Sequence, residues 1–300
     1  MATDAKVWFI TGASRGLGLR WAAAALERGD RVAATARDIA PLADLVELCG
    51  ERVLPIALDV TDRQAGIVAV DLACEWFGRL DVLVNNAGYG QFGFIEEISA
   101  QQARDQFDTN VFGALWLTQA ALPIMRDQRS GHIIQVSSIA GITAFAGAGI
   151  YNASKWALEG FSEALAWEVA PLGIRVTLVE PAIDATGWRD ATQHATPIDD
   201  YADLHQAASQ AISDKLAARH DPAAAATALL DVVDAPDPPL RVILGSDALR
   251  IAADDDQRRL TTTSRFAART DTHEGESRKK TGLEPQKKRD RSVGFQALSS

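Results

Sequence analysis

The sequence is poor in cysteine, and its histidines are scattered. Cys49 and Cys74 are the two cysteines among 300 residues; they form no CxxC motif, and neither has a histidine nearby. A disulfide framework or a structural zinc site needs several such residues at short spacing, so we predict neither. None of the five histidines belongs to a metal-ligand pattern, and we therefore predict no metal site.

The chain also lacks long apolar runs and an overall excess of basic charge. No apolar stretch approaches the ~20 residues that span a bilayer, and the first residues contain no signal-peptide core. We therefore expect a cytoplasmic protein without a membrane partner. The formal charge is -10, of which residues 261–300 contribute +4 and residues 1–260 contribute -14. Such an acidic body argues against nucleic acid as a partner, because neutralising phosphates dominates that kind of binding.

What the chain does contain is an alternation of short apolar runs with longer stretches of helical periodicity. This alternation predicts an α/β fold, a doubly wound parallel sheet of about seven strands with helices on both faces, Rossmann-like and in a single domain. The predicted strands are Val7–Thr11, Arg31–Ala36, Val53–Leu58, Asp81–Asn85, His132–Ser137, Arg175–Val179 and Arg241–Leu244. The predicted helices between them are Leu17–Arg28, Pro41–Cys49, Arg63–Phe77, Gln101–Arg126 and Tyr151–Ala170.

The pattern weakens after Pro181. Residues 182–200 contain turn formers without a clean period, so we predict a long loop that covers a site, before helices near Tyr201–Arg219 and Pro222–Val233. We expect a catalytic domain over residues 1–250 that includes a substrate loop at about 182–220. Residues 251–300 are polar and mixed in charge, which predicts a largely disordered extension.

The first predicted strand runs directly into a glycine-rich turn, Gly12-Ala13-Ser14-Arg15-Gly16-Leu17-Gly18, and a predicted helix follows at once. Glycines at such a place permit a tight turn, a close approach of backbone to a pyrophosphate and close packing of helix on strand. The N-terminus of the helix then offers unpaired N–H groups to the phosphates. The string of glycines is weak by itself, and its position between strand and helix is what favours a nucleotide site.

With two later segments, this turn resembles that of the short-chain dehydrogenases/reductases in their single-domain form. Leu58-Asp59-Val60 resembles the family's adenine-contacting element, and Asn85-Asn86-Ala87-Gly88 resembles its NNAG segment. The resemblance is close over residues 6 to about 187, vague to about 250, and absent from the tail. It implies a nicotinamide dinucleotide held by Gly12, Ser14, Arg15, Gly16, Leu17, Gly18, Arg37, Asp59, Val60, Asn86, Ala87, Gly88, Tyr151, Lys155, Pro181 and Thr186.

The end of the second predicted strand bears on the choice between NADP and NAD. In dinucleotide folds an acid beyond the glycines holds the ribose 2′-OH, whereas a nearby arginine accommodates a 2′-phosphate. By the resemblance, the acid would stand at Ala36, and Arg37 and Arg15 supply two guanidinium groups instead. We therefore predict that NADP(H) is preferred. Asp38 leaves NAD(H) open, because its carboxylate is near enough in sequence to bind a free 2′-OH.

Tyr151 and Lys155 stand four residues apart at the start of a predicted helix, which puts both side chains on one helical face. A free tyrosine has a pKa of about 10, and a neighbouring ammonium can lower it toward the pH at which a general acid works well. An isolated pair of this kind is usually an ordinary surface pair. Lys155 is, however, the one lysine between Lys6 and Lys215, which favours a functional role.

The resemblance assigns Tyr151 as the proton donor or acceptor and Lys155 as the residue that contacts the nicotinamide ribose. Ser138, at the end of a predicted strand, would polarise the substrate oxygen, and Ser137 beside it is a competitor for that role. Asn110, in Thr-Asn-Val, would hold a water that links the lysine to solvent. The implied activity is NADP(H)-dependent interconversion of a ketone or aldehyde and an alcohol, by hydride transfer with a tyrosine acid/base.

The loop that begins at Pro181 departs from the family pattern. The family reads Pro-Gly-x-x-x-Thr there, and this chain reads Pro-Ala-Ile-Asp-Ala-Thr. By resemblance Thr186 would hold the carboxamide of the cofactor, while Ala182 stands in place of the glycine. The predicted substrate is a largely apolar small molecule, since the positions that line the pocket in relatives are Gln91, Phe92, Phe94, Phe145 and Trp188.

Other readings of the sequence stay open. An NAD-dependent secondary alcohol dehydrogenase differs only in its cofactor, and a dinucleotide sensor would not need the Asn, Ser, Tyr and Lys. A sugar-nucleotide epimerase or dehydratase also uses Tyr-x-x-x-Lys, but with another glycine spacing and a larger C-terminal domain. In related proteins the helices corresponding to 101–126 and 151–170 form the oligomer interface, so the resemblance implies a homodimer or homotetramer.

Overall fold

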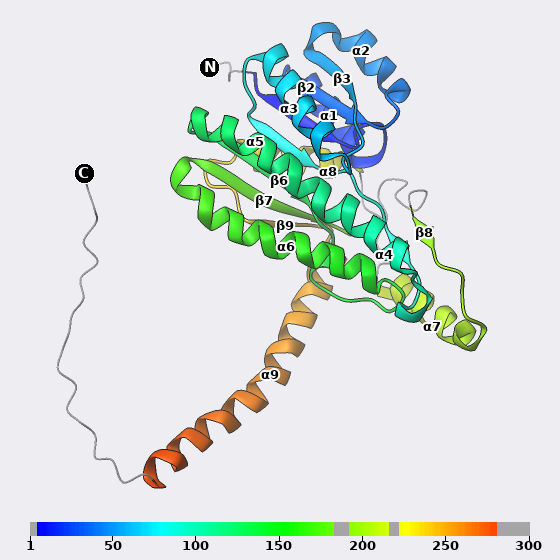
Figure 1. The fold of residues 1–300 in the computed structure, drawn as a ribbon, viewed down its shortest axis with the longest axis vertical. Helices are drawn as coiled ribbons and strands as arrows, with labels where there is room; N and C mark the ends of the chain where they lie inside the picture. The colour runs from blue at the N-terminus through cyan, green and yellow to red at the C-terminus, as the bar shows by residue number, and fades with distance from the viewer. Residues whose placement is uncertain (1–4, 183–191, 216–221, 281–300) are drawn as a thin grey trace, which may run out of the picture. The chain divides into compact units, whose positions relative to one another are not determined.

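The computed structural model describes residues 5–182, 192–215 and 222–280 (Figure 1). In these residues seven parallel strands form one sheet, which confirms the predicted fold class. The sheet order is β3-β2-β1-β4-β6-β7-β9, so the strand order reverses beside β1, as in doubly wound folds. The strands are β1 (Val7–Thr11), β2 (Arg31–Ala36), β3 (Val53–Ala57), β4 (Val82–Asn85), β6 (Gly131–Val136), β7 (Ile174–Pro181) and β9 (Arg241–Leu244).

The two faces of the sheet carry separate hydrophobic cores, because successive side chains of a strand point to opposite faces. In β1, Val7 and Phe9 belong to the core under one helix layer, whereas Trp8 and Ile10 belong to the core under the other. The first layer contains α3 (Arg63–Phe77), α5 (Ala114–Gln128) and α6 (Gly149–Val169), and the second contains α1 (Gly16–Glu27), α2 (Ala43–Cys49) and α8 (Pro222–Asp234).

The predicted helix Gln101–Arg126 is interrupted in the structure. It consists of α4 (Ala100–Phe107), a π-helical turn over Asp108–Gly113, and α5. The turn contains Asn110, whose side chain hydrogen-bonds the backbone of Tyr89 in both directions. Such π-turns often occur at functional sites. A sequence with continuous helical periodicity gives no signal for this local change of winding.

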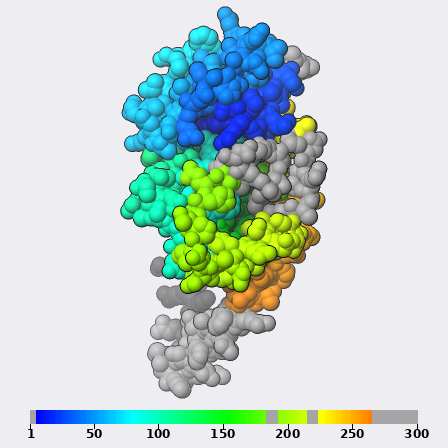
Figure 2. All heavy atoms as spheres, turned by 90° about the vertical axis from the view of Figure 1, so that its right-hand side faces the viewer, coloured from blue at the N-terminus to red at the C-terminus, as the bar shows by residue number. Residues whose placement is uncertain are grey.

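Part of the predicted loop over 182–200 has regular structure. β8 (Gln193–His194) pairs in parallel with β5 (Gln91–Phe92), and α7 (Ala202–Lys215) follows after a short 3₁₀ turn. Glu97 accepts hydrogen bonds from the backbone N–H of Ile198 and from Phe94, and it contacts His205, so the segment is tied to the chain after β4. Figure 2 shows α7, in yellow-green, exposed at the surface. Residues 183–191 and 216–221 lie outside the described residues.

The chain divides into two compact units, one to Ala253 and one from Asp254. Helix α9 (Ser246–Lys280) occupies residues where the sequence predicted disorder, so for 254–280 the structure differs from that expectation. Asp255 contacts Arg258 and Arg259, at the i,i+3 and i,i+4 spacings that favour helix in a polar segment. Within the described residues, no helix is both long and apolar enough to cross a membrane.

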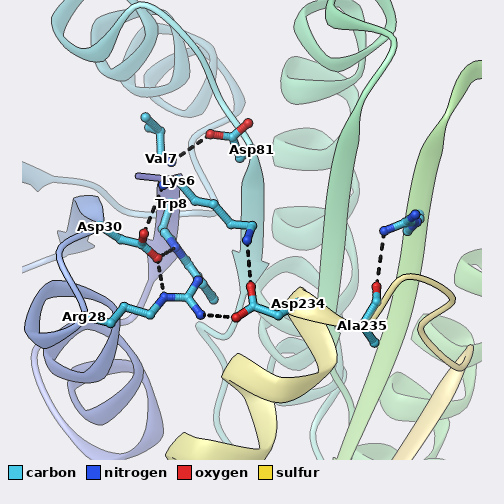
Figure 3. Close-up of polar contacts among 9 residues, drawn as sticks. Lys6, Val7, Trp8, Arg28, Asp30, Asp81, Asp234 and Ala235 are labelled. Atoms are coloured by element: carbon cyan, nitrogen blue, oxygen red, sulfur yellow. Dashed lines mark hydrogen bonds and ion pairs between the residues drawn. The ribbon is translucent and has the colours of Figure 1, made fainter. Parts of the chain in front are cut away.

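A buried carboxylate joins the amino ends of β1 and β2, opposite the glycine turn. Figure 3 shows Asp30 between Lys6, Trp8 and Arg28: it accepts from the Lys6 N–H at 3.0 Å, the Trp8 indole N–H at 2.8 Å and the Arg28 guanidinium at 2.6 Å. Asp234 at the end of α8 pairs with Lys6 and Arg28 in turn. These bonds connect the first strand, the first helix and the end of α8.

Replacing Asp30 with alanine is expected to lower the free energy of unfolding by about 3 kcal/mol, because it leaves the buried Trp8 indole N–H without its partner and removes one of the two carboxylates that bind Arg28. Urea unfolding at equilibrium measures this loss. The control is Asp127→Ala, since the side chain of Asp127 is 82% exposed and its oxygen lies 3.9 Å from Arg126. Equal effects of the two substitutions would contradict a stabilising role for the Asp30 network.

Candidate active site

A cleft of about 640 Å³ lies at the carboxyl ends of the strands. Parallel strands end at one edge of the sheet, so the residues that follow them meet there even though they are far apart in sequence. Of the residues predicted from sequence, those that line the cleft are Gly12, Ser14, Arg15, Gly16, Leu17, Arg37, Asp59, Val60, Asn86, Ala87, Gly88, Ser138, Tyr151, Lys155 and Pro181.

The glycine turn presents the N-terminus of α1 to the cleft. Gly12 and Gly16 have φ angles of +64° and +61°, which side-chain-bearing residues rarely adopt. Arg15 precedes the helix without a side-chain cap, so the first N–H groups of α1 are free of side-chain partners. Gly18 does not line the cleft; a Cβ there would lie 2.5 Å from the Asn86 amide nitrogen, so glycine allows close packing. The turn therefore fits a pyrophosphate.

The segment after β4 is bound directly to the glycine turn. The Asn86 side chain donates to the carbonyl oxygens of Thr11, at 2.7 Å, and Gly12, at 3.1 Å. In return the Thr11 hydroxyl accepts from the N–H groups of Asn86 and Ala87, at 2.9 and 2.8 Å. Both carbonyls and both N–H groups are thereby satisfied. The glycine turn and the segment after β4, which line the cleft from two sides, are therefore fixed relative to each other.

Two basic side chains and an apolar residue line the cleft near the end of β2 and in the glycine turn. By the family pattern Ala36 stands where an acid would bind a ribose 2′-OH; Arg37 follows it, and Arg15 lines the cleft from the glycine turn. Asp38 does not line the cleft; its carboxylate accepts from the Ala40 N–H at 3.0 Å. Asp59 lines the cleft, and its carboxylate accepts from the backbone and hydroxyl of Thr61, at 3.0 and 2.8 Å.

Tyr151 and Lys155 lie in the first turns of α6, buried and on the same face of the helix. The Lys155 ammonium donates to the Val136 carbonyl oxygen at 2.7 Å and lies 6.0 Å from the centre of the Tyr151 ring. Burial lowers the pKa of Lys155 to about 8, although the nearby Glu159 carboxylate acts in the opposite direction.

The prediction that Lys155 lowers the pKa of Tyr151 is wrong for this structure. Burial raises the pKa of Tyr151 to about 12, and a hydrogen bond with Ser138 opposes that rise. The physical reason is that removing the phenol from water disfavours its ionised form more strongly than the neighbouring groups favour it. Tyr151 is therefore held as a neutral hydroxyl, which is the form that can donate a proton.

The two serines at the end of β6 face different neighbours. Ser138 hydrogen-bonds with Tyr151, and its hydroxyl also accepts from the Ala140 N–H at 3.1 Å. Ser137 interacts with Glu159 on α6. Both line the cleft, but the alternation of side chains along an extended chain directs their hydroxyls to different places. Ser138 is thus the serine beside the tyrosine.

Asn110 is buried and does not line the cleft. Its amide donates to the Tyr89 carbonyl at 3.0 Å and to the Ser154 hydroxyl at 3.2 Å, and its oxygen accepts from the Tyr89 N–H at 3.1 Å. These bonds connect the π-helical turn to the segment after β4 and to α6. In the described structure Asn110 therefore joins the segment after β4 to α6 at Ser154, next to Lys155.

The aromatic residues predicted to bind substrate are distributed unevenly. The Phe92 ring lies 6.0 Å from the Tyr151 ring and stacks on His194, and Phe145 packs in the same apolar cluster as Tyr151. Phe94 instead stacks on His205, at 4.3 Å. Gln91 is fully buried; its backbone N–H donates to the Gln106 side chain, and its side-chain amide donates to the Phe92 carbonyl. Thr186 and Trp188 lie outside the described residues.

Several lining residues were not predicted from sequence. Asp105, Asp108 and Thr109 lie within about two helical turns of Asn110. Helical spacing from Asn110 could therefore have predicted that they line the cleft. Thr192 and Gln193 reach the cleft through the β5–β8 pairing, for which no local pattern exists. Other unpredicted lining residues are Thr61, Tyr89 and Val136. Among the described residues, no group of three or more His, Cys, Asp or Glu side chains is arranged to hold a metal ion.

Comparisons with known proteins place these features in one family. The model of the short chain dehydrogenase family matches residues 6–196. The chain is 42% identical over 253 residues to oxidoreductase BOA17 of Botryotinia fuckeliana, which is 82% of this chain and 91% of that protein. It is 35% identical over 243 residues to the 3-ketodihydrosphingosine reductase of Bacteroides thetaiotaomicron, covering 80% of this chain and 88% of the reductase.

Solved structures agree with the sequence matches. A short-chain dehydrogenase from Streptomyces avermitilis superimposes with a TM-score of 0.80 and 39% identity, covering 89% of this chain and 98% of that chain. A short-chain dehydrogenase/reductase from Burkholderia phymatum in complex with NAD gives 0.74 and 26%, covering 86% and 96%. ElxO with NADP bound gives 0.70 and 25%, covering 82% and 99%.

The matched region contains the glycine turn, the Asn86 tie and the Tyr151–Lys155 pair, which together line one cleft. Similar structures hold NAD or NADP, and the turn described above fits the pyrophosphate of either dinucleotide. The resemblance seen in the sequence is therefore confirmed: this chain belongs to the short-chain dehydrogenase family and is an oxidoreductase with a site for a nicotinamide dinucleotide.

Proposed function

We propose that this chain is an NADP(H)-dependent oxidoreductase that interconverts a ketone or aldehyde and an alcohol on a largely apolar small molecule. The observation that carries the proposal is that the Tyr151 hydroxyl, hydrogen-bonded with Ser138, lies with Lys155 in the cleft that begins at the glycine turn. A sensor that only binds a dinucleotide has no need of a buried, serine-paired tyrosine in that cleft.

Preference for NADP over NAD is supported by charge at the end of β2. Arg15 and Arg37 line the cleft, and guanidinium groups bind phosphate with charge-assisted, bidentate hydrogen bonds. The rival for a free 2′-OH is Asp38, whose carboxylate is engaged with the Ala40 N–H outside the cleft lining. The carboxylate that could bind a free 2′-OH is thus directed to its own loop instead of the cleft.

In the reduction direction the protein groups act on the carbonyl oxygen. A nicotinamide dinucleotide bound in the cleft would supply a hydride to the carbonyl carbon. Tyr151 donates its proton to the oxygen, and the neutral phenol described above is the form required for that step. Ser138 hydrogen-bonds the same oxygen and shares the negative charge that develops there. Lys155, fixed by the Val136 carbonyl, binds the nicotinamide ribose and carries positive charge beside Tyr151. In the family pattern Pro181 and Thr186 hold the nicotinamide end of the cofactor.

An apolar substrate is supported by the surroundings of Tyr151. The tyrosine belongs to a cluster of apolar side chains, into which Phe92 and Phe145 also pack. Desolvating a charged substrate against such a surface is unfavourable. The similar 3-ketodihydrosphingosine reductase bears the name of a keto compound, which agrees with a carbonyl substrate here. Gln91 and Trp188 stay proposed pocket residues.

We also propose that the chain forms a homodimer or homotetramer through α5, α6 and the π-helical turn. Large apolar side chains are exposed there, with Phe112 at 40%, Trp156 at 42% and Trp167 at 78% of their surface. Exposed aromatic residues gathered on adjacent elements are typical of protein interfaces. A second copy of the chain is the partner that the family resemblance implies.

Fluorescence titration of the purified protein with NADPH and NADH is expected to show tighter binding of NADPH. Arg37→Ala should weaken NADPH binding about 10- to 100-fold and leave NADH binding nearly unchanged, because the lost bonds are charge-assisted and reach only the 2′-phosphate. The control is Arg20→Ala, an exposed arginine on α1 that does not line the cleft. Equal affinity for both cofactors, or tighter NADH binding, would transfer the role to Asp38.

Tyr151→Phe is expected to lower kcat for NADPH-dependent reduction of acetophenone by about 10²- to 10⁴-fold, since the proton donor is lost. Binding of NADPH should persist, which separates chemistry from cofactor binding. Tyr201→Phe is the matched control, because the Tyr201 hydroxyl hydrogen-bonds Glu96 away from the cleft. Retention of kcat in Tyr151→Phe would remove Tyr151 from the mechanism.

A further inference from the structure

A buried group of charged side chains joins the catalytic helix α6 to strands β7 and β9. Glu180 of β7 is fully buried, and Glu159 of α6 is nearly so. Both carboxyls face one guanidinium: the Arg241 Nε lies 3.1 Å from a Glu159 oxygen and 3.6 Å from a Glu180 oxygen. Arg241 also pairs, at 2.7 Å, with the half-exposed Glu163 one turn further along α6.

One arginine cannot neutralise these carboxyls together. Two carboxylates that share a buried site cannot both ionise easily, so one of them retains its proton. Burial, and then the charge of Glu159, raise the pKa of Glu180 to about 8, against the influence of Arg241. Burial also raises the pKa of Glu159, while Ser137 and Arg241 oppose that rise. Neither Glu180 oxygen receives a hydrogen bond from another donor in the described residues, so a proton held between the two carboxyls at neutral pH would satisfy this buried group.

Glu159 is the member of this pair that contacts the site. It follows Lys155 by four residues on α6, and its charge favours the ammonium form of Lys155. Its carboxyl also interacts with Ser137, the residue before Ser138. Through Glu180 and Arg241 it reaches two strands of the sheet. The pair thus connects the helix and the strand end that carry the reacting side chains.

We propose that Glu159 and Glu180 are positioning residues: they form a carboxyl pair that shares one proton and holds α6, with Tyr151 and Lys155, in place against the sheet. When that proton is lost, two adjacent buried carboxylates repel each other and the contact between α6 and β7 weakens. The consequence for catalysis rests on the proposed function, whereas the pair itself does not.

The sign of the pH dependence follows from the raised pKa of Glu180. The folded chain binds this proton more tightly than the unfolded chain, so the stabilising effect is complete below the ordinary carboxyl pKa of 4.5 and is lost as pH rises through about 8. The charged groups that face the pair are Lys155 and Glu163 from α6 and Arg241 from β9. Since the pKa of Lys155 is also about 8, a variant must separate the two titrations.

Glu180→Gln makes that separation, because the amide donates a hydrogen bond to Glu159 at every pH and cannot ionise. Hydrogen–deuterium exchange of the peptide spanning 149–163 is compared between variant and wild type at the same pH, so that intrinsic exchange rates cancel. Between neutral pH and about pH 9.5, above the pKa of Glu180, the ratio of wild-type exchange to variant exchange should rise about tenfold.

Glu163→Gln is the matched control, since it removes another carboxylate from the same helix and the same arginine but lies outside the pair. It should exchange like wild type at both pH values. Wild-type exchange that matches Glu180→Gln at alkaline pH, or a protective effect of Glu163→Gln equal to that of Glu180→Gln, would overturn the proposal. If Glu180→Gln does not fold, Glu159→Gln gives the same comparison, because its amide can donate to Glu180.

Kinetics with NADPH and acetophenone then test the effect on the site. The alkaline fall of kcat should be less steep in Glu180→Gln, where Lys155 alone titrates near pH 8, than in wild type, where Glu180 titrates there as well; KM should change little, because a misplaced helix affects the reacting groups. An unchanged profile beside normal activity would contradict the positioning role. If wild type shows no NADPH-dependent reduction, the proposed function fails, and hydrogen exchange still decides whether the pair holds α6.

Discussion

The hydrogen bonds between Asn86 and the glycine turn are the interaction on which the rest of the site depends. They fix the segment after β4 to the end of β1, and they satisfy backbone groups that the turn leaves without secondary-structure partners. Gly18 then allows α1 to pack against the same amide. The positions of the helix N-terminus, of Gly88 and of the adjoining strand ends follow from this tie, so nucleotide binding and catalysis share one rigid edge of the sheet.

Helix α6, which carries Tyr151 and Lys155, is held by a second set of buried polar contacts. Asn152 donates to the carbonyls of Ala140 and Thr143, and Lys155 donates to that of Val136, so the start of α6 is joined to the end of β6. These bonds have no competition from water, which makes them effective in fixing geometry. The same dryness raises the pKa of Tyr151 and lowers that of Lys155. Burial therefore fixes the positions of these side chains, but it also disfavours their charged forms. At Lys155 the carboxylate of Glu159 partly offsets the lowering of the pKa.

Sequence patterns predicted what local chemistry determines. The strands, the glycine turn and the Tyr151–Lys155 spacing are short-range features, and each appears within a residue or two of its predicted place. The direction of the Tyr151 pKa shift was wrong, because it depends on burial among residues from distant parts of the chain. Thr192 and Gln193 were missed for the same reason. The helical start of the C-terminal extension was missed because composition alone ignores spaced pairs such as Asp255–Arg259.

The central claim is that the cleft brings a hydride donor and the Tyr151 hydroxyl to the same carbonyl group. Mass spectrometry of the alcohol formed from acetophenone with NADPH that carries deuterium at both C4 positions tests it most directly. The account predicts deuterium on the carbinol carbon in the product of wild type and no labelled alcohol from Tyr151→Phe above trace amounts. Alcohol without deuterium, or label transfer that persists at the wild-type rate without the hydroxyl, would contradict it.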